Sequence, residues 1–384
     1  MAEIPKIILR IETSVAYGRG LLYGIAKYSR IHGPWAFYSE PGAEQTALPH
    51  LDKWGASGII TRIPDEGKLD QLVINGLPAI LIPLKEKIPD FPNIIDDCAT
   101  AGRMAAEHLL DRGFRNFAFC GFSDMHWSRD RRENFTKRIA KAGFETQSYE
   151  RPRAKVVCYY QKELRLLAEW LNLLPRPVGV MTCDDEHGRH AVEACKVAGL
   201  HVPEQVAIVG VDNDELTCTL SDPPLSSIAV NTRKAGYKAA ALLDRLMTGR
   251  EKMAEKKIIV RPLHVVTRQS TDVLAIKDRE VAEAIRFIHR NAKRPIQVSD
   301  AADAAALSRR VLEKRFRKIM GRSVYGEINR QRIGHVAGML VDTDQSISQI
   351  ALSLGYPSVK HIARSFRREK GMSPLAYRKQ YGFK

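Results

Sequence analysis

The sequence of 384 residues lacks an apolar run of about 18 residues, which a membrane-spanning helix would need. Its opening residues, MAEIPKIILRIETSV, lack the basic stretch followed by an apolar stretch that marks an export signal. The six cysteines are scattered and form no CxxC pair, which argues against a disulfide framework and against a zinc site. We therefore expect a cytoplasmic protein without a membrane span, a metal or a cofactor.

Motifs of common enzyme classes are also missing. The sequence has no P-loop, no HExxH, no nucleophile elbow and no GxGxxG after the first predicted strand. We therefore expect no enzymatic activity. A sugar-modifying enzyme is the remote alternative, because paired aspartates can perform acid–base chemistry.

The net charge of +16 is unevenly distributed along the chain. Residues 277–384 contain 23 Lys and Arg but only 10 Asp and Glu, whereas the preceding residues contain 37 and 34. A basic module beside a nearly neutral one is typical of a protein that binds a polyanion such as nucleic acid. A solvated basic surface is the simpler alternative.

The basic part of the chain contains one helical unit twice, fifty positions apart. Residues 308–325 read SRRVLEKRFRKIMGRSVY, and residues 358–375 read SVKHIARSFRREKGMSPL. Each copy begins with a serine that can cap a helix, continues as a basic amphipathic helix and reaches a glycine at its end. Two such helices, each preceded by a short helix, predict an all-α domain with helix-turn-helix units at 296–321 and 347–371.

In a helix-turn-helix unit the second helix enters the major groove, and its N-terminal side chains read base edges. Later arginines of such a helix are expected to hold phosphates, and Glu313 can accept a hydrogen bond from cytosine N4. The predicted DNA contacts are Arg309, Arg310, Glu313, Lys314, Arg317, Val359, Lys360, His361, Arg364, Arg367 and Arg368. A middle helix at 325–340 is expected to set the separation of the two footprints.

Residues 1–272 alternate short apolar runs with amphipathic stretches, a pattern typical of parallel sheets with helices on both faces. Strands are predicted at 7–11, 58–60, 79–82, 117–120, 179–182, 207–211 and 258–260. Helices are predicted at 18–30, 100–112, 130–141, 162–173, 187–198 and 232–246. This length predicts an α/β core of two lobes, followed by a linker at 273–278 and the helical domain at 279–384.

Polar side chains follow two of the predicted strands. Asp184 and Asp185 come after one strand, and Asp212, Asn213 and Asp214 come after another. Ligands of open α/β sheets bind beyond the carboxyl ends of the strands, so these residues are candidates for a binding site. Each of them could instead cap the helix that follows.

Residues 332–378 resemble the signature of the AraC/XylS family of transcription regulators. The matching positions are Arg332-Ile333, Ala337, Leu340, Ile347, Ile350-Ala351, Gly355-Tyr356, Ser358, Phe366-Arg367, Gly371, Ser373-Pro374 and Tyr377-Arg378. The sequence departs from the family at His361-Ile362, where an aromatic pair is usual, and at Val324, where a proline is usual. The resemblance implies that the chain binds double-stranded operator DNA and contacts RNA polymerase.

Residues 1–272 resemble the periplasmic-binding-protein-like core of LacI/GalR repressors, in segments 101–121, 202–216 and 223–249 and around Asp184. Such a core followed by an AraC-type domain is similar to a family of xylose-responsive regulators. The resemblance implies a homodimer that senses D-xylose and activates genes of xylose catabolism. Another pentose or a sugar acid as effector, or action as a repressor, is the alternative.

Applied position by position, the same resemblance implies a set of sugar ligands. Carboxylates accept from sugar hydroxyls, arginine donates to two acceptors, and an aromatic face can cover the ring. The implied polar ligands are Arg19, Arg131, Asp184 and Asp212, with Asn213 as a weaker member. Trp127, in a loop after the strand at 117–120, is our own candidate for the stacking residue. Trp127 could instead be core packing, and Arg131 could pair with Asp130 or Glu133 on a helix surface.

Overall fold

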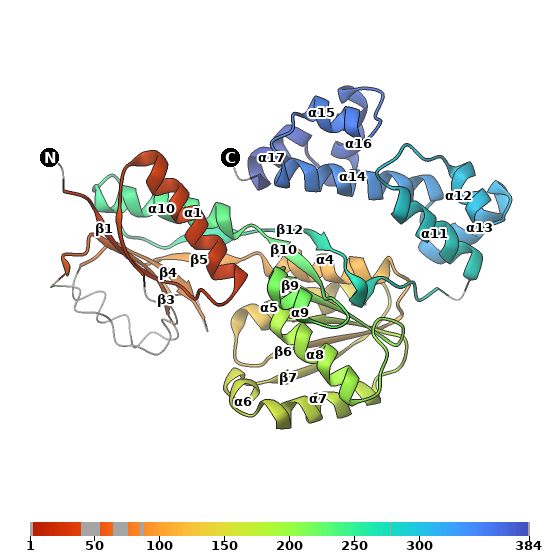
Figure 1. Cartoon of the computed structure of the whole chain (residues 1–384), viewed down its shortest axis with the longest axis horizontal. Coiled ribbons are helices and arrows are strands. Elements are labelled where there is room, and N and C mark those ends of the chain that lie inside the picture. The colour runs from red at the N-terminus through yellow and green to blue at the C-terminus, as the bar shows by residue number, and fades with distance from the viewer. Residues whose placement is uncertain (1–2, 40–53, 64–75, 85–87, 277, 383–384) are drawn as a thin grey trace. The chain divides into compact units, whose positions relative to one another are not determined.

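The computed structural model describes residues 3–39, 54–63, 76–84, 88–276 and 278–382 (Figure 1). Contacts divide the chain into two compact units. The first unit comprises Met1–Ala106 and Asn116–Asp272, and the second comprises Glu107–Arg115 and Val273–Lys384. Within the described ranges, none of the helices combines the length and the apolar character that crossing a bilayer requires.

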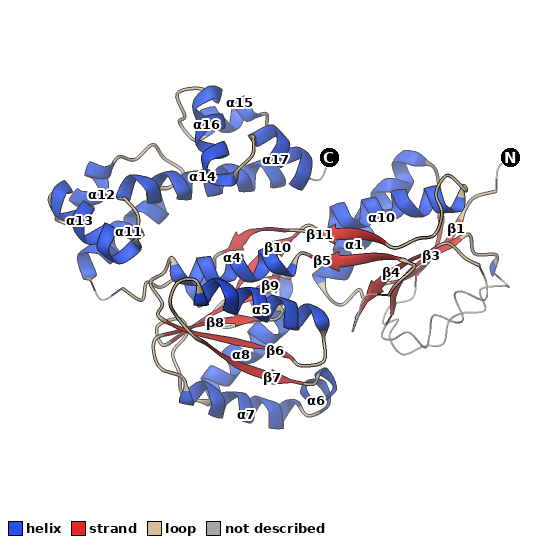
Figure 2. Ribbon diagram, turned by 180° about the vertical axis from the view of Figure 1, so that it is seen from behind, coloured by secondary structure: helices blue, strands red, loops and turns tan. Residues whose placement is uncertain are grey.

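The first unit contains two six-stranded sheets (Figure 2), which confirms the predicted α/β core. The first sheet has the order β11-β5-β4-β3-β1-β2, and its neighbouring strands are parallel. Its strands are β1 (Lys6–Arg10), β2 (Ala36–Ser39), β3 (Gly58–Ile63), β4 (Ala79–Pro83), β5 (Pro92–Asp96) and β11 (Lys256–Val260). Strands β4 and β5 consist almost entirely of buried residues, as expected for a sheet covered on both faces.

The second sheet has the order β12-β10-β9-β8-β6-β7 and is parallel except for the antiparallel edge strand β12. Its strands are β6 (Asn116–Phe122), β7 (Thr146–Arg151), β8 (Val178–Thr182), β9 (Val206–Asp212), β10 (Ser226–Val230) and β12 (Pro262–Val266). The chain passes between the two sheets three times, through β5 to β6, β10 to β11 and β11 to β12. Each sheet is therefore built from segments that are distant in the sequence.

The six helices that the sequence pattern predicts in this unit are present, whereas the helices at 153–158 and 215–220 and the 3-10 turn at 269–271 were not predicted. The helices of this unit are α1 (Ala16–His32), α4 (Cys98–Leu110), α5 (His126–Ala140), α6 (Arg153–Cys158), α7 (Tyr160–Leu173), α8 (Asp185–Val197), α9 (Glu215–Leu220), α10 (Thr232–Met247) and the 3-10 turn η2 (Gln269–Thr271). Helices α1 and α10 approach each other closely at Gly24, where an added Cβ atom would lie only 2.0 Å from the backbone oxygen of Arg233. Glycine is what permits this contact.

All seven predicted strands are present, whereas β2, β5, β7, β10 and β12 were not predicted. Strands β2, β7 and β12 lie at sheet edges, where half-exposed side chains give no apolar run. Strand β10 contains two buried serines: the Ser226 hydroxyl accepts from the Thr271 hydroxyl of η2, and the Ser227 hydroxyl donates to Asp185. A pattern of apolar residues alone cannot detect strands of these kinds.

The second unit is helical beyond Asp272, as predicted. Its helices are α11 (Arg279–Asn291), α12 (Val298–Ala304), α13 (Arg309–Met320), α14 (Val324–Asp342), α15 (Ile347–Ser353), α16 (Val359–Lys370) and α17 (Pro374–Tyr381). One apolar core surrounds Leu312 and Phe316, and another surrounds Ile362 and Phe366. Helix α14 contributes side chains to both cores and joins the two halves.

The second helices of the two helix-turn-helix units, α13 and α16, begin and end with the same types of residue. The Ser308 and Ser358 hydroxyls accept from the backbone N–H groups of Val311 and His361, as the capping prediction required. Gly321 and Gly371 end the helices in the left-handed conformation. The turns before the second helices need a positive φ as well, at Ala306 (φ 50°) and Gly355 (φ 64°).

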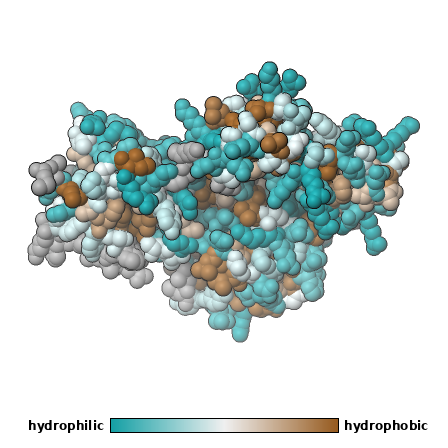
Figure 3. All heavy atoms as spheres, turned by 45° about the horizontal axis from the view of Figure 1, so that its top comes forward, coloured by the Kyte–Doolittle hydropathy of each residue, from teal (hydrophilic) through white to brown (hydrophobic). Residues whose placement is uncertain are grey.

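Hydrophilic residues cover most of the face shown in Figure 3, and apolar residues form several separate groups on it. Small, separate groups of exposed apolar side chains are normal for a folded protein surface. The functional signal therefore lies in buried polar groups and in charge.

Two substitutions of the same type should change stability in opposite directions. Gly355→Ala forces a Cβ into a left-handed turn and should lower the free energy of unfolding by about 1 kcal/mol. Gly334→Ala, in the exposed middle of α14 with open space around it, should raise it by roughly 0.5–1 kcal/mol. Urea unfolding of the full chain, followed by circular dichroism, measures both, and a gain at position 355 would contradict the assigned turn.

Candidate functional site

A cavity of about 460 Å³ lies in the first unit and is lined by residues of both sheets. This volume is typical of sites for small molecules. From the first sheet and α1 come Glu12, Ser14, Val15, Ala16, Tyr17, Arg62, Ile82, Pro83, Ile94, Ile95 and Asp96. From the second sheet and its helices come Phe122, His126, Trp127, Arg131, Arg153, Val156, Asp184, Asp185, Glu186, His187, His190, Asp212, Asp214 and Thr217.

The Arg131 guanidinium is the central charge of this cavity. Its side chain is only 2% exposed, donates from Nη2 to the Asp96 carboxylate at 2.9 Å and lies 3.5 Å from Asp212. Its Nη1 donates to the backbone oxygen of Cys183. Arg131 thus joins the ends of strands β5, β8 and β9, and the alternative of a surface pair with Asp130 or Glu133 is wrong.

Two buried polar atoms of this group lack hydrogen bonds among the described residues, namely Nε of Arg131 and Oδ1 of Asp212. Asp212 has a positive φ of 106°, a conformation that residues other than glycine rarely adopt. Burial raises the pKa of the Asp212 carboxyl to about 7, against the lowering effect of Arg131 and with a further rise from Asp96. Strain and unsatisfied polar atoms together indicate a site that a ligand completes.

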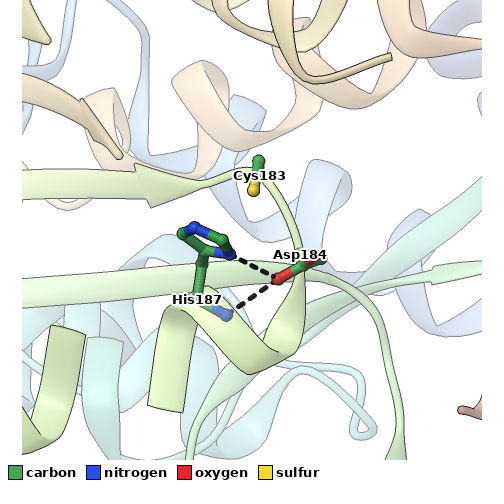
Figure 4. A group of neighbouring side chains, drawn as sticks. All are labelled: Cys183, Asp184 and His187. Atoms are coloured by element: carbon green, nitrogen blue, oxygen red, sulfur yellow. Dashed lines mark hydrogen bonds and ion pairs between the residues drawn. The ribbon is translucent and has the colours of Figure 1, made fainter. Parts of the chain in front are cut away.

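Asp184 both caps a helix and faces the cavity. Its Oδ1 accepts from the backbone N–H of His187 at 2.8 Å and lies 3.2 Å from the His187 ring (Figure 4). Although burial alone would raise it, the contacts with His187 hold the pKa of Asp184 at about 2. The capping interpretation and the binding interpretation are therefore compatible for this residue.

Cys183, Asp184 and His187 bring possible metal ligand atoms within 4.8 Å of one another (Figure 4). The Cys183 thiol is fully buried, and burial together with the Asp184 charge raises its pKa well above the usual range. A metal would need the thiolate. Because Asp184 Oδ1 is already engaged by His187, we assign Asp184 and His187 to helix capping and to the cavity wall, and Cys183 to the packing behind them.

Trp127 does not lie in a loop, so that prediction is wrong: it lies in the first turn of α5. Helix periodicity puts it one turn before Arg131, whose guanidinium is 5.1 Å from the centre of the Trp127 ring. The ring also meets Phe122 edge to face. Trp127 thus lines the cavity and packs against its wall at the same time.

Arg19 and Asn213 lie beside the cavity and do not line it. Arg19 donates to the backbone oxygens of Thr13 and Ser14 and pairs with Asp214 at 3.0 Å. The Asn213 amide oxygen accepts from Arg268 at 2.8 Å. Both side chains are engaged with protein partners, and a direct role in binding stays a prediction.

The remaining acidic residues after β8 and β9 have distinct structural roles. Asp214 caps α9 and accepts from the backbone N–H of Ala16, so it connects α9 with the start of α1. Asp185 is buried and accepts from the Ser227 hydroxyl and the Asp214 backbone. Burial and the Asp212 charge raise the pKa of Asp185 well above its usual range. The capping alternative is thus correct for Asp214 and wrong for Asp212.

Asp96 is a cavity residue that the sequence analysis missed. It ends β5 and accepts from the Tyr17 hydroxyl at 2.8 Å and from Arg131. The signal was present, because the sequence PNIIDD ends a short apolar run with aspartate, as β8 and β9 do. It was not used because β5 itself was not predicted. The histidines His126, His187 and His190 carried no signal of their own.

The second unit presents the predicted DNA contacts on α13 and α16. The side chains of Arg309, Arg310, Lys314, Arg317, Val359, Lys360, His361, Arg364, Arg367 and Arg368 are exposed, and Glu313 is partly buried. Leu312 and Phe316 on α13, and Ile362 and Phe366 on α16, face the two cores. Each second helix therefore shows a basic face to solvent, as a major-groove helix must.

Two family models match separate parts of the sequence. The family model of the periplasmic binding protein-like domain matches residues 106–271, and that of a helix-turn-helix domain matches residues 301–380. The Xylose operon regulatory protein of Haemophilus influenzae is 31% identical, over 97% of this chain and 98% of that protein. The protein of the same name from Escherichia coli K12 is 29% identical, over 97% and 96%.

Among solved structures, that of the xylose-binding transcription activator xylR covers 100% of both chains, with 28% identity and a TM-score of 0.61. A complex of the transcriptional regulator CelR with cellobiose covers 69% of this chain and 84% of that chain, with 21% identity and a TM-score of 0.56. The second likeness concerns the fold of the core alone.

The raised pKa of Asp212 should be visible in the pH dependence of stability. Its folded-state pKa of about 7 exceeds the ordinary 3.8, so the folded protein retains a proton that the unfolded chain releases between these values. The contribution of this group to stability is therefore present at low pH and is lost as pH rises toward 7.

Asp212→Asn removes that loss. The difference in unfolding free energy between the variant and the natural protein should increase in favour of the variant by on the order of 2 kcal/mol from pH 5 to pH 8. Urea titrations of both proteins at the two pH values measure the difference. Parallel pH dependence in the two proteins would show that Asp212 is ionised throughout.

Proposed function

The chain belongs to the family of xylose operon regulatory proteins, and from that premise we propose that its cavity binds D-xylose. The protein is a sugar-responsive DNA-binding regulator of transcription and not an enzyme. We propose further that it activates genes of xylose catabolism from the cytoplasm as a homodimer that contacts RNA polymerase.

The observation that carries the sugar proposal is the pair of unsatisfied atoms in the cavity wall. Among the described residues, Arg131 Nε has no hydrogen-bond acceptor and Asp212 Oδ1 accepts no hydrogen bond, although Arg131 Nη2 lies 3.5 Å from this oxygen. A sugar hydroxyl offers both functions in one group. Two adjacent hydroxyls of a pentose can therefore satisfy both atoms, while the Trp127 ring at the same wall covers the apolar side of the sugar.

The charge of the cavity favours a neutral sugar over a sugar acid. The wall contains Asp96, Asp184 and Asp212, and Arg131 already has two carboxylates as partners. The carboxylate of a sugar acid would add a further negative charge to this group and would be repelled. A neutral pentose brings only hydroxyls.

The sugar would act by changing the arrangement of the two sheets of the first unit relative to each other. The Arg131–Asp96 and Arg19–Asp214 pairs link groups on the two sheets around the cavity. A ligand that contacts Arg131 and Asp212 adds to these links and favours the conformation in which they form. Its influence is limited to its difference in affinity between the two conformations.

The helical domain suits a bipartite operator. Helix α14 has 19 residues, which corresponds to a length of about 28 Å. Successive major grooves on one face of DNA are separated by about 34 Å. A helix of this length between α13 and α16 allows both to enter adjacent grooves.

Isothermal calorimetry tests the sugar proposal. D-xylose should bind the natural protein, and Asp212→Ala should weaken binding roughly 10- to 100-fold, because Arg131 and the sugar hydroxyl each lose a partner. Asp222→Asn, which changes an exposed carboxylate outside the cavity, is the matched control and should bind normally. The absence of heat and of a thermal shift with the natural protein at millimolar D-xylose would refute the proposal.

Operator binding distinguishes base contacts from phosphate contacts. Arg364→Gln, in the middle of α16, should weaken the free energy of operator binding by about 1–3 kcal/mol and relax the preference for one base. Arg368→Gln, in the last turn, should weaken binding to all sequences and reduce the salt slope by about one. Arg250→Gln, exposed in the first unit, is the control. If Arg364→Gln changes only the salt slope, Arg364 binds phosphate.

A further inference from the structure

Helix α4 belongs to both units of the protein. It begins at Cys98, two residues after Asp96, and the Asp97 carboxylate accepts from the backbone N–H of Thr100 at 3.0 Å. Residues up to Ala106 belong to the first unit, and Glu107–Arg115 belong to the second. One short helix therefore starts at the cavity wall and ends among the residues of the DNA-binding unit.

The far end of α4 is held by charge. Asp111, one residue after the helix, is only 12% exposed and pairs with Arg322 at 2.9 Å and with Arg330. Arg322 precedes α14, and Arg330 lies within it. The carboxylate of Asp111 thus connects the end of α4 to the first half of the helix that joins both helix-turn-helix units.

A second carboxylate completes the cluster around these arginines. Glu327 on α14 is fully buried and accepts from Arg322 at 2.6 Å and from Gln331 at 2.7 Å, with His289 of α11 at 3.2 Å. Although burial alone would raise it, His289 and the two arginines hold the pKa of Glu327 well below its usual range. Asp111 and Glu327 therefore share two arginines in a partly buried network.

Backbone contacts hold the same end of α4 in place. The backbone N–H of Ala275 donates to the Arg112 oxygen at 2.8 Å. Gly113, with φ of 83°, lies so close to the segment after Asp272 that an added Cβ would be 2.6 Å from Ile276. Gly113 and Ile276 are therefore closely packed, and a shift of α4 along or about its axis would disturb this packing.

We propose that helix α4 transmits occupancy of the cavity to the DNA-binding unit, and that Asp111 is the residue through which it positions α14. The inference rests on the proposed sugar binding. A sugar that contacts Arg131 changes the environment of its partner Asp96, from which α4 begins. At the other end, a small shift of Asp111 moves α14, which sets the separation of α13 and α16. Packed helices respond to such shifts by moving between discrete arrangements.

The test measures coupling and not binding alone. Operator affinity of the full-length protein is determined by fluorescence anisotropy with and without D-xylose, and sugar affinity is determined by calorimetry. Asp111→Asn keeps the shape of the side chain and removes its charge. It should bind D-xylose within about twofold of the natural protein, while the ratio of operator affinities with and without sugar falls to within about twofold of one.

Glu283→Gln is the matched control. It removes a carboxylate that pairs with Arg286 on the surface of α11 in the same unit, and it should keep the natural ratio. The swapped variant Asp111→Arg with Arg330→Asp should recover at least part of the ratio. If Asp111→Asn keeps the natural ratio, or lowers operator affinity equally with and without sugar, the proposal is wrong.

Amide hydrogen exchange in the natural protein gives an answer that does not depend on how the variants fold. D-xylose should change the protection of residues 107–115 and 324–332, and unchanged protection in both segments would overturn the proposal. If the natural protein binds no D-xylose, or if D-xylose does not change its operator affinity, the proposed function itself is refuted. The two failures are thus distinguishable.

Discussion

The buried guanidinium of Arg131 is the interaction on which the sensing unit depends. A charge that is 2% exposed is stable only with partners, and its partners come from the ends of β5, β8 and β9. Two of these strands belong to one sheet and the third belongs to the other. The same charge that fixes the cavity wall therefore links the two sheets, so ligand contact and sheet arrangement cannot change independently.

The DNA-binding unit is subject to a different constraint, because its two basic helices must be held at a defined distance from each other. Each half has its own small apolar core, built around a phenylalanine at the same position of the repeat. Helix α14 contributes to both cores along its length. Its buried side chains keep it helical despite Gly334, whose low helix propensity the packing outweighs. The separation of the basic faces is therefore determined by packing along one helix.

Charged side chains that belong to none of the apolar cores form the proposed connection between sugar sensing and DNA binding. The proposed path uses a carboxylate at each end of α4, Asp96 at the cavity and Asp111 among the arginines of α14. Charged contacts suit this purpose, because they are directional and can exchange partners with little change in packing. The apolar cores can then remain intact while the helices between them shift.

The sequence by itself determined the fold class, the repeat, the helix caps and the basic faces, because these follow from local spacing: a serine, a buried phenylalanine and a glycine at fixed intervals define each second helix. It also placed Asp184 and Asp212 at strand ends. Only the tertiary structure decided that Asp212 Oδ1 has no hydrogen-bond partner in the part of the chain that the structure describes, that Asp96 joins Arg131 and that Asp111 meets Arg330. These contacts join residues 35 to more than 200 positions apart, and no local pattern records which distant side chains a folded chain brings together.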